Sequence, residues 1–446
     1  MDFVPHTSQQ VQAMLKEIGI KSTDQLFDEI PTELQNADLA GIQPGLSEQD
    51  MQRKLSGLAR QDETGPCFMG AGCYDHYIPA AVWDVATRGE FYTAYTPYQA
   101  EASQGALQLL YEFQTMIASL TAMDVANASV YDGASGLAEA VLMAVRLQRK
   151  IKNHKVFYAG GLNPFYRDTV RTLVSSQGID FVEIPHEDGV LDVDAVHSEE
   201  YVAIVIQQPN FFGLLESVDE LTDRAHELGA LVIASVNPLS LALLKPPGEW
   251  GETGADIVCG DGQPLGIPMN SGGPSYGFMC TRLPNVRQMP GRIVGKTLDI
   301  DGETGYTLTL QAREQHIRRG KATSNICTNQ GLLVTASTIF MSVVGHSGLA
   351  DMAYRSATNT RKLVDQACQV DFVDRKFPGC FFHEAVLQLN RPVEDVYEFM
   401  RKNNVLAGIP LGRYFPELAD SLLVCATEQR YQDEIDLFCK LLAEFN

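Results

Sequence analysis

Residues 313–330, REQHIRRGKATSNICTNQ, concentrate side chains that bind anions. The basic side chains are Arg313, His316, Arg318, Arg319 and Lys321. The hydroxyl and amide side chains that follow are Thr323, Ser324 and Asn325. The whole chain carries only 34 Lys and Arg against 56 Asp and Glu, so this basic segment stands out as a local positive field. Such a field suits a phosphate, a carboxylate or an acidic partner surface. A solvated segment held by salt bridges is the alternative interpretation.

Two tyrosine-rich loops, at residues 68–83 and 91–105, form a second group. Their polar side chains are Tyr74, Asp75, His76, Tyr77, Tyr92, Tyr95, Thr96, Tyr98, Gln99 and Glu101. Loops with many hydroxyl groups commonly line a site for a small polar ligand. Aromatic packing at a subunit interface is the alternative, and both interpretations hold if the site lies at such an interface.

Three turns follow predicted strands, on the side of a parallel sheet where α/β proteins bind ligands. The turn in YDGASGLAEA, residues 131–140, leads into a helix whose first backbone N–H groups would bind an anion, although such turns are common without one. The turn in QQPNFFG, residues 207–213, either lies beside a ligand or only reverses the chain. The turn in GADIVCGDGQPLGIP, residues 254–268, carries the amide of Gln263.

The elements that must position these groups begin with a polar helical arm. We predict helices at residues 9–18, 23–29 and 48–59, the last behind a capping Ser47. The arm is too polar to form a core alone. We therefore expect it to pack on another domain or on a partner subunit.

From residue 103 onward, helix and strand patterns alternate. A long helix follows the expected cap Ser103, and the strand NASVY at residues 127–131 precedes the next helix. Later strand candidates are KVFYAG, IDFVEIP, YVAIVIQQP, ALVIASV and ADIVCG, with helix patterns between them. This alternation predicts a mostly parallel sheet covered by helices on both faces.

The pattern changes after Lys321, with helices predicted at residues 329–341 and 349–369. Strand, helix, strand and helix patterns then close the chain and predict a small α+β domain. We thus predict an N-terminal helical arm at 1–65, a large α/β domain at 66–328 and a small C-terminal α+β domain at 329–446.

Composition argues against several classes of function. The formal net charge of −22 repels nucleic acid and anionic lipid. The nine cysteines are scattered without metal-ligand spacing, so we expect no metal site. The first residues lack the features of a signal or transit peptide, and the apolar run at 332–344 is too short to span a bilayer. We therefore expect a cytoplasmic protein without a membrane span.

Several long motifs resemble one known family. They are YTAYTPYQAEASQGAL, VANASVYDGAS, QQPNFFG, GDGQPLGIPMNSGGPSYGFM, MPGRIVG and REQHIRRGKATSNICTNQ. Along nearly the whole chain they resemble the first subunit of the two-subunit glycine dehydrogenase (decarboxylating), the P-protein of the glycine cleavage system. The chain departs from the family at Ala100, where Pro is usual, and at Gly320, where Glu is usual.

The resemblance implies a fold type I, aspartate aminotransferase-like PLP-transferase architecture. Enzymes of this kind that use pyridoxal phosphate need a Lys on the turn for the Schiff base and a carboxylate on the preceding strand. Compared with the family's second subunit, this chain has Gln263 at the Lys position and Ser235 at the Asp position. Because an amide cannot form an imine, the resemblance implies that pyridoxal phosphate is bound by the partner subunit.

Active sites of fold type I enzymes lie at subunit interfaces, so the resemblance also implies that this chain completes its partner's site. The residues expected to reach that site are Tyr74, Asp75, His76, Tyr77, Tyr95, Thr96, Tyr98, Gln99, Arg318, Lys321, Thr323, Ser324 and Asn325. The implied enzyme is a heterotetramer of two copies of each subunit. It would decarboxylate glycine and transfer the aminomethyl group to the lipoyl arm of the H-protein.

Two other interpretations stay open from the sequence. The chain could support or regulate its partner without giving any group to the chemistry. It could also be an independent pyridoxal phosphate enzyme with an unexpected Lys, although Lys245 and Lys296 fall in other elements than the turn.

Overall fold

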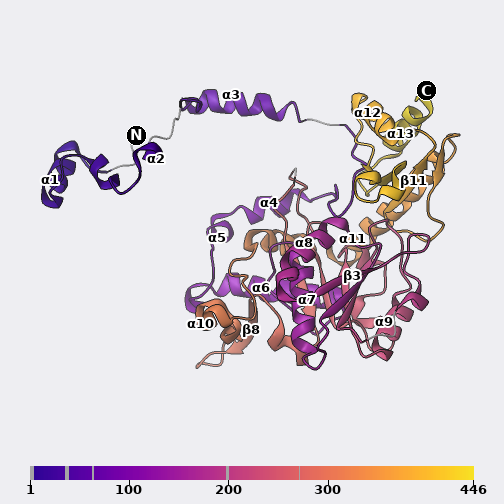
Figure 1. Cartoon of the computed structure of the whole chain (residues 1–446), viewed down its shortest axis with the longest axis horizontal. Helices are drawn as coiled ribbons and strands as arrows, with labels where there is room; N and C mark the ends of the chain where they lie inside the picture. Colours follow the sequence, from indigo (N-terminus) through magenta and orange to yellow (C-terminus); the bar gives the residue numbers. More distant parts are fainter. Residues whose placement is uncertain (1–4, 36–39, 63–64, 197–199, 271, 446) are drawn as a thin grey trace. The chain divides into compact units, whose positions relative to one another are not determined.

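The computed structural model describes residues 5–35, 40–62, 65–196, 200–270 and 272–445. The chain divides into two compact units, Met1–Glu63 and Thr64–Asn446 (Figure 1). The smaller unit is helical, with α1 at Ser8–Ile18, α2 at Thr32–Gln35 and α3 at Glu48–Ala59. The helices predicted at 9–18 and 48–59 are confirmed, and the one predicted at 23–29 is a 3₁₀ helix at Thr23–Phe27.

The larger unit is built on a seven-stranded sheet in the order β1-β7-β6-β5-β4-β2-β3. Strands β2 to β6 pair in parallel, whereas β7 is antiparallel to β6 and to β1. The strands are β1 (Val125–Ala126), β2 (Lys155–Ala159), β3 (Asp180–Ile184), β4 (Ala203–Gln208), β5 (Leu231–Val236), β6 (Ile257–Asp261) and β7 (Gly277–Thr281). The predicted mostly parallel sheet is confirmed.

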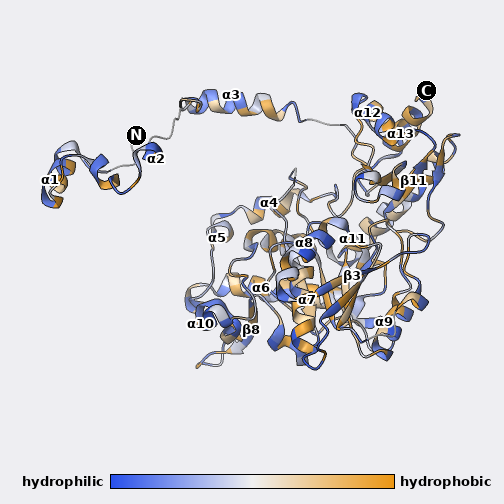
Figure 2. Cartoon of the chain, in the orientation of Figure 1, coloured by the Kyte–Doolittle hydropathy of each residue, from blue (hydrophilic) through white to orange (hydrophobic). Residues whose placement is uncertain are grey.

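Helices cover both faces of this sheet. Phe157 and Tyr158 of β2 enter opposite buried clusters, because successive strand side chains point to opposite faces. One face packs against α6 (Gln104–Thr121), α9 (Val218–Glu227) and the first half of α11 (Gly331–Ala367). The other packs against α7 (Gly133–Leu147) and α8 (Pro164–Val174). Figure 2 shows α7 coloured mainly as hydrophobic, as its burial requires.

A second core belongs to the C-terminal part. Its sheet has the order β10-β11-β13-β12, and its helices are α12 (Val393–Lys402) and α13 (Gln432–Glu444). The strands are β10 (Val373–Arg375), β11 (Glu384–Leu389), β12 (Ile409–Pro410) and β13 (Ser421–Cys425). Phe68, from the segment before α4 (Ala80–Ala86), is buried in this core and bonds through its backbone to Leu406 and Cys425. The segment that contains Phe68 therefore joins the C-terminal core.

The remaining elements are α5 (Gly89–Tyr92), the hairpin of β8 (Ile293–Leu298) and β9 (Thr304–Thr309), and α10 (Gln315–Arg318), which carries the predicted residue Arg318. The strand predicted at 127–131 is wrong, because Ser129 has a φ of 101° and Val130 makes only an isolated bridge. Ser103 precedes α6 as predicted but makes no side-chain cap bond there, since its own backbone is not extended.

The helices predicted at 329–341 and 349–369 form one element, α11, with a break at Gly345. Gly345 has φ 65° and ψ 179°, so the chain changes direction between the two halves. By length and composition alone α11 could cross a membrane, and half of its most apolar window is buried inside the protein.

Candidate functional site

Gln263 lies in the turn after β6, and its side-chain amide is engaged with the backbone. Its Oε1 accepts the N–H of Tyr74 at 2.9 Å. Its Nε2 donates to the carbonyl of Tyr74 at 2.9 Å and to that of Ile267 at 2.7 Å. Gln263 is only 3% exposed. Its amide therefore holds the segment around Tyr74 against the turn.

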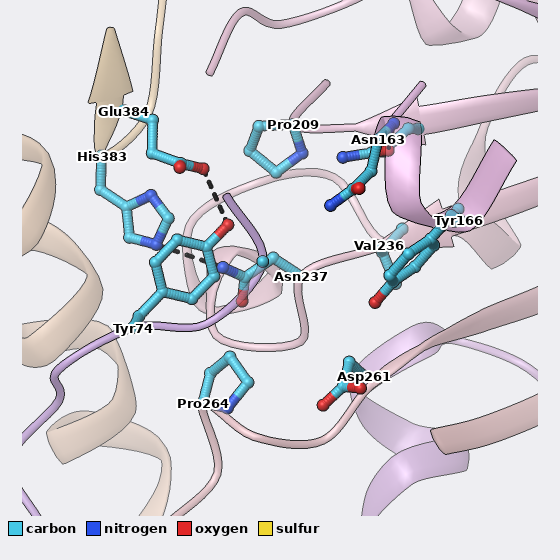
Figure 3. Close-up of a pocket in the computed structure, with 13 residues that line it drawn as sticks. Tyr74, Asn163, Tyr166, Pro209, Val236, Asn237, Asp261, Pro264, His383 and Glu384 are labelled. Atoms are coloured by element: carbon cyan, nitrogen blue, oxygen red, sulfur yellow. Dashed lines mark hydrogen bonds between the residues drawn. The ribbon is translucent and has the colours of Figure 1, made fainter. Parts of the chain in front are cut away.

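Ser235 lies near the end of β5, where it lines a cavity of about 30 Å³. That space alone suits a water molecule and not a pyridine ring, and Asn163, Tyr166 and Asp261 line both it and a wider neighbouring cavity. Figure 3 shows side chains that surround this small cavity. The Tyr74 hydroxyl donates to Glu384 at 2.7 Å, and His383 Nε2 lies 3.2 Å from the Asn237 amide nitrogen. Ser235 lies opposite Cys259 of β6 in the parallel register of the two strands.

The chain's own carboxylates occupy the N-terminus of α7. Asp132 accepts the N–H of Ser135 at 2.7 Å, and Asp261 at the end of β6 accepts the N–H of Gly133 at 3.0 Å. Burial raises the pKa of Asp261 to about 6. In Figure 3 the hydroxyl of Tyr166 is directed toward Asp261. The backbone N–H groups of Gly133 and Ser135, which could have bound an anion, are thus bound from within the chain.

A wider cavity of about 800 Å³ opens beside this turn. Asp132, Asp261, Tyr131 and Tyr166 line it, and among the described lining residues there is no Lys or Arg. A phosphate in this cavity would meet two carboxylates and no cation, which is electrostatically unfavourable. Together with the amide at Gln263, these groups do not fit pyridoxal phosphate.

The other lysines considered from the sequence do not change this result. Lys245 pairs with Asp219 at 2.8 Å, and Lys296 lies on β8. Neither residue lines the cavity beside the turn.

The first tyrosine-rich loop is tied to the C-terminal core. Asp75 pairs with Arg430 at 2.9 Å, and His76 Nδ1 lies 2.7 Å from a Glu428 oxygen. Glu428 also accepts the N–H of Tyr77 at 2.6 Å. Burial opposes ionisation of Glu428, but these hydrogen bonds outweigh it and lower its pKa. The Tyr77 side chain remains exposed, whereas the Asp75 carboxylate and the Nδ1 of His76 bind within the chain.

The second tyrosine-rich loop lies beside the basic segment. Tyr95 is 79% exposed, and its hydroxyl is 3.1 Å from that of Thr328. The Tyr98 ring is 5.6 Å from the Arg292 guanidinium and 5.5 Å from the His316 ring. The other predicted residues of this loop are Thr96, which is half-buried, and Gln99, which is exposed.

The basic segment presents part of its charge to solvent. Arg318 and Lys321 are exposed and, with Arg149 and Arg287, line a cavity of about 380 Å³. Arg313, in contrast, is buried, and its guanidinium donates to backbone carbonyls, including that of Gly291 at 3.0 Å. The predicted positive field is therefore made by exposed residues around a buried, structural arginine.

The three residues after the basic segment differ in their surroundings. The N–H of Thr323 donates to the carbonyl of Arg313 at 2.9 Å, and the hydroxyl of Ser324 donates to Glu139 at 2.7 Å. Asn325 is exposed. The structure thus brings the second tyrosine-rich loop and residues 316–328 together, and ties the first loop to the C-terminal core.

The Pro-Asn turn after β4 has a structural role. Asn210 is 2% exposed, and its Oδ1 accepts the N–H groups of Phe212 and Leu214. Its Nδ2 donates to Glu216 at 2.7 Å. Of the two interpretations of QQPNFFG, these contacts favour the turn.

Buried charged side chains that the sequence interpretation missed organise the site. Arg292 donates to the carbonyl of Cys327 at 2.5 Å, Glu139 holds Ser324, and Glu384 accepts the N–H of Ala71 at 2.6 Å. Burial raises the pKa of Glu384 to about 7. The sequence did contain a signal for these three residues. Each stands in a run of apolar residues, and a charged side chain that is buried there needs a partner.

Comparison with known proteins places this fold and site in one family. The model of the glycine cleavage system P-protein family matches residues 1–442. A probable glycine dehydrogenase (decarboxylating) subunit 1 from Legionella pneumophila is 54% identical over 447 positions, covering 99% of this chain and 98% of that protein.

Solved structures agree. The crystal structure of an inhibitor-bound glycine decarboxylase, the P-protein of the glycine cleavage system, matches with a TM-score of 0.90 and 39% identity, covering all of both chains. Glutamate decarboxylase from Lactobacillus brevis matches with a TM-score of 0.68 at 12% identity, covering 95% of this chain and 96% of that one, which shows the shared fold type I architecture. The chain therefore belongs to the glycine cleavage system P-protein family, among the relatives that form subunit 1 of glycine dehydrogenase (decarboxylating).

Proposed function

We propose that this chain is an obligate catalytic subunit that holds no pyridoxal phosphate of its own and completes the active site of subunit 2. The pair would decarboxylate glycine and transfer the aminomethyl group to the lipoyl arm of the H-protein. Subunit 2 would bind the cofactor, and two copies of each subunit would form a cytoplasmic heterotetramer.

The observation that carries the proposal is the set of contacts in the pocket at the ends of β5 and β6. The Gln263 amide donates both its N–H groups to backbone carbonyls, and Asp261 accepts an N–H at the start of α7. The space beside Ser235 measures only about 30 Å³. These contacts support a role in which the chain offers groups to another subunit and does not hold the cofactor itself.

The face formed by the second tyrosine-rich loop and residues 316–328 supplies such groups. Its exposed hydrogen-bond donors include Tyr95, Tyr98, Gln99, Arg318, Lys321 and Asn325. Guanidinium, ammonium and hydroxyl groups hold carboxylate and phosphate anions, and an interface closed around them excludes water. Tyr77 would be the exposed contribution of the first tyrosine-rich loop.

Borohydride reduction tests where the cofactor is held. The isolated chain, its Gln263→Lys variant and the chain mixed with subunit 2 are each incubated with pyridoxal phosphate, reduced and analysed by peptide mass spectrometry. We expect no labelled Lys in this chain, even in the variant, because Asp261 still occupies the N-terminus of α7. The label should appear on a Lys of subunit 2. A labelled Lys in the unmodified chain would contradict the proposal.

Substitutions on the exposed face test the catalytic contribution. In the reconstituted pair, Asn325→Ala and Tyr95→Phe should each lower kcat, by a factor on the order of 10² if the lost donor binds the transition state. Tyr354→Phe, which removes an exposed hydroxyl from α11, is the matched control. Normal turnover in both variants, with intact assembly by size-exclusion chromatography, would favour a subunit that only supports or regulates its partner.

A further inference from the structure

Glu139 is a buried carboxylate on α7 to which the proposed function gives no role. It is 6% exposed, and its Oε1 accepts the hydroxyl of Ser324 at 2.7 Å. Its buried Oε2 has no hydrogen-bond partner in the part of the chain that the structure describes. Burial raises the pKa of Glu139, while Ser324 and Arg146 act in the opposite direction. A buried carboxylate with one unpaired oxygen costs stability, so its bond to Ser324 points to a specific role.

The loop that Glu139 holds lies over a cavity of about 500 Å³. Glu139 and Arg146 line this cavity from α7, and Thr323, Ser324 and Asn325 line it from the loop. On this side the loop residues face the cavity. Single hydrogen bonds therefore have a large share in fixing its position.

Ser324 connects Glu139 to the loop backbone. While its hydroxyl donates to Glu139, it also accepts the N–H of Ile326 at 3.1 Å. Near the two ends of the loop, the Arg313 carbonyl accepts the N–H of Thr323 and the Arg292 guanidinium donates to the Cys327 carbonyl. In the middle, Ile326 packs against the buried cluster of α7, and the bond to Glu139 adds a polar contact that uses the Ser324 hydroxyl within the chain.

We propose that Glu139 is a positioning residue, which fixes Ser324 and thereby holds Asn325 and Thr323 in place for the partner's active site. This inference rests on the proposed function, because it assumes that the loop serves subunit 2. It also changes the role expected for Ser324, from a group that contacts ligand to one that anchors the loop.

Trypsin cleavage of the full, isolated chain tests the anchor without catalysis, since Arg318, Arg319 and Lys321 offer cleavage sites next to the loop. Glu139→Ala and Ser324→Ala should each speed cleavage there about tenfold, the factor expected for loss of one hydrogen bond to a charged group. The double variant should be cleaved no faster than either single variant, because both changes remove the same bond.

Two further variants serve as controls. Glu139→Gln keeps an acceptor oxygen for Ser324 and should be cleaved as slowly as the unmodified chain. Glu398→Ala, which changes a solvent-accessible residue of α12, is the other control.

Turnover in the reconstituted pair tests the role in the reaction. Glu139→Ala and Ser324→Ala should lower kcat about tenfold, with Glu139→Gln close to the unmodified chain. Unchanged cleavage in both alanine variants would overturn the inference, whatever Asn325→Ala does to turnover. A different outcome is faster cleavage of the Glu139→Ala and Ser324→Ala variants together with normal turnover of both and of Asn325→Ala. That outcome would show that the loop does not serve the partner, and it would overturn the proposed function together with the inference.

Discussion

Single polar side chains join the two cores of the larger unit. Gln263, from the turn after β6, binds the backbone of Tyr74, while Glu384, from β11, binds the N–H of Ala71 and the hydroxyl of Tyr74. Residues 71–74 are therefore held between one buried anchor from each core. Because loss of a partner leaves the opposite group buried and unpaired, at a cost of about 1–3 kcal/mol, both anchors are needed for a stable joint.

The pH dependence of stability tests the Glu384 anchor. Its pKa is raised from 4.5 to about 7 in the folded chain. Between these values the folded state binds the proton more tightly than the unfolded state, so stability falls as pH rises through this range. Glu384→Gln keeps an acceptor for Ala71 but cannot ionise, and should reduce the loss of stability between pH 5 and pH 8 by about 2 kcal/mol.

Thermal and urea unfolding at several pH values measure this difference. The control is Glu398→Gln, because the hydrogen bond from Arg401 lowers the pKa of exposed Glu398, so that it stays ionised across the range. If the Glu384→Gln variant lost as much stability between pH 5 and pH 8 as the unmodified chain, Glu384 would not be the buried carboxylate that titrates in this range.

Among the elements, α11 connects the same two cores. Its first half contributes Phe340 and Met341 to the cluster of the large sheet, and its second half contributes Leu363 and Val364 to the C-terminal cluster. Gly345, between them, has backbone angles that side-chain-bearing residues essentially never adopt. The direction change at Gly345 therefore sets how α11 reaches both cores.

Gly345→Ala should destabilise the chain by about 1–3 kcal/mol, the cost of holding a residue with a side chain in that conformation. The cost is one of backbone strain alone, since an added Cβ would meet no atom within 4 Å. Ser347→Ala, two residues later on an exposed helical position, is the matched control and should be neutral or slightly stabilising. Unfolding curves of the two variants give the comparison, and equal stabilities would show that the break is not needed.

For the whole molecule, the smaller unit is the part with the least buried apolar surface. Met14 and Ile18 of α1 and Met51, Leu55 and Leu58 of α3 are all exposed. The compact larger unit has its own cores. Exposed apolar side chains at helical spacing are typical of surfaces that bind another domain or another chain. We therefore expect the smaller unit to pack on another domain or on a partner subunit, and the partner can be tested directly.

The full-length variant Leu55→Gln/Leu58→Gln tests this expectation. Gln retains helix propensity and length, so the melting temperature of the isolated chain should not change. Association with subunit 2 should weaken by at least about tenfold, because each buried Leu contributes about 2 kcal/mol. Analytical ultracentrifugation measures the affinity, with Gln52→Ala on α3 as control. Unchanged affinity would assign α3 no part in assembly.

Much of the fold was predictable because local patterns repeat what the tertiary structure needs. Runs such as YVAIVIQQP predict a strand buried on both faces, and β4 at Ala203–Gln208 confirms it. The break at Gly345 and the positive φ at Ser129 were not predicted, because a single residue's dihedral angles depend on surrounding contacts. For the same reason, the sequence could not show that Phe68 joins the C-terminal core.

The sequence by itself determined the family, the mostly parallel sheet and the presence of an amide where a pyridoxal phosphate enzyme needs an amine, since these depend on residue types and their order. Only the tertiary structure decided that the Gln263 amide is bound to backbone, that Asp261 occupies the start of α7, and that Glu139 anchors Ser324. These contacts join residues far apart in the chain, and a side chain's partners are fixed only when packing brings such residues within hydrogen-bond distance.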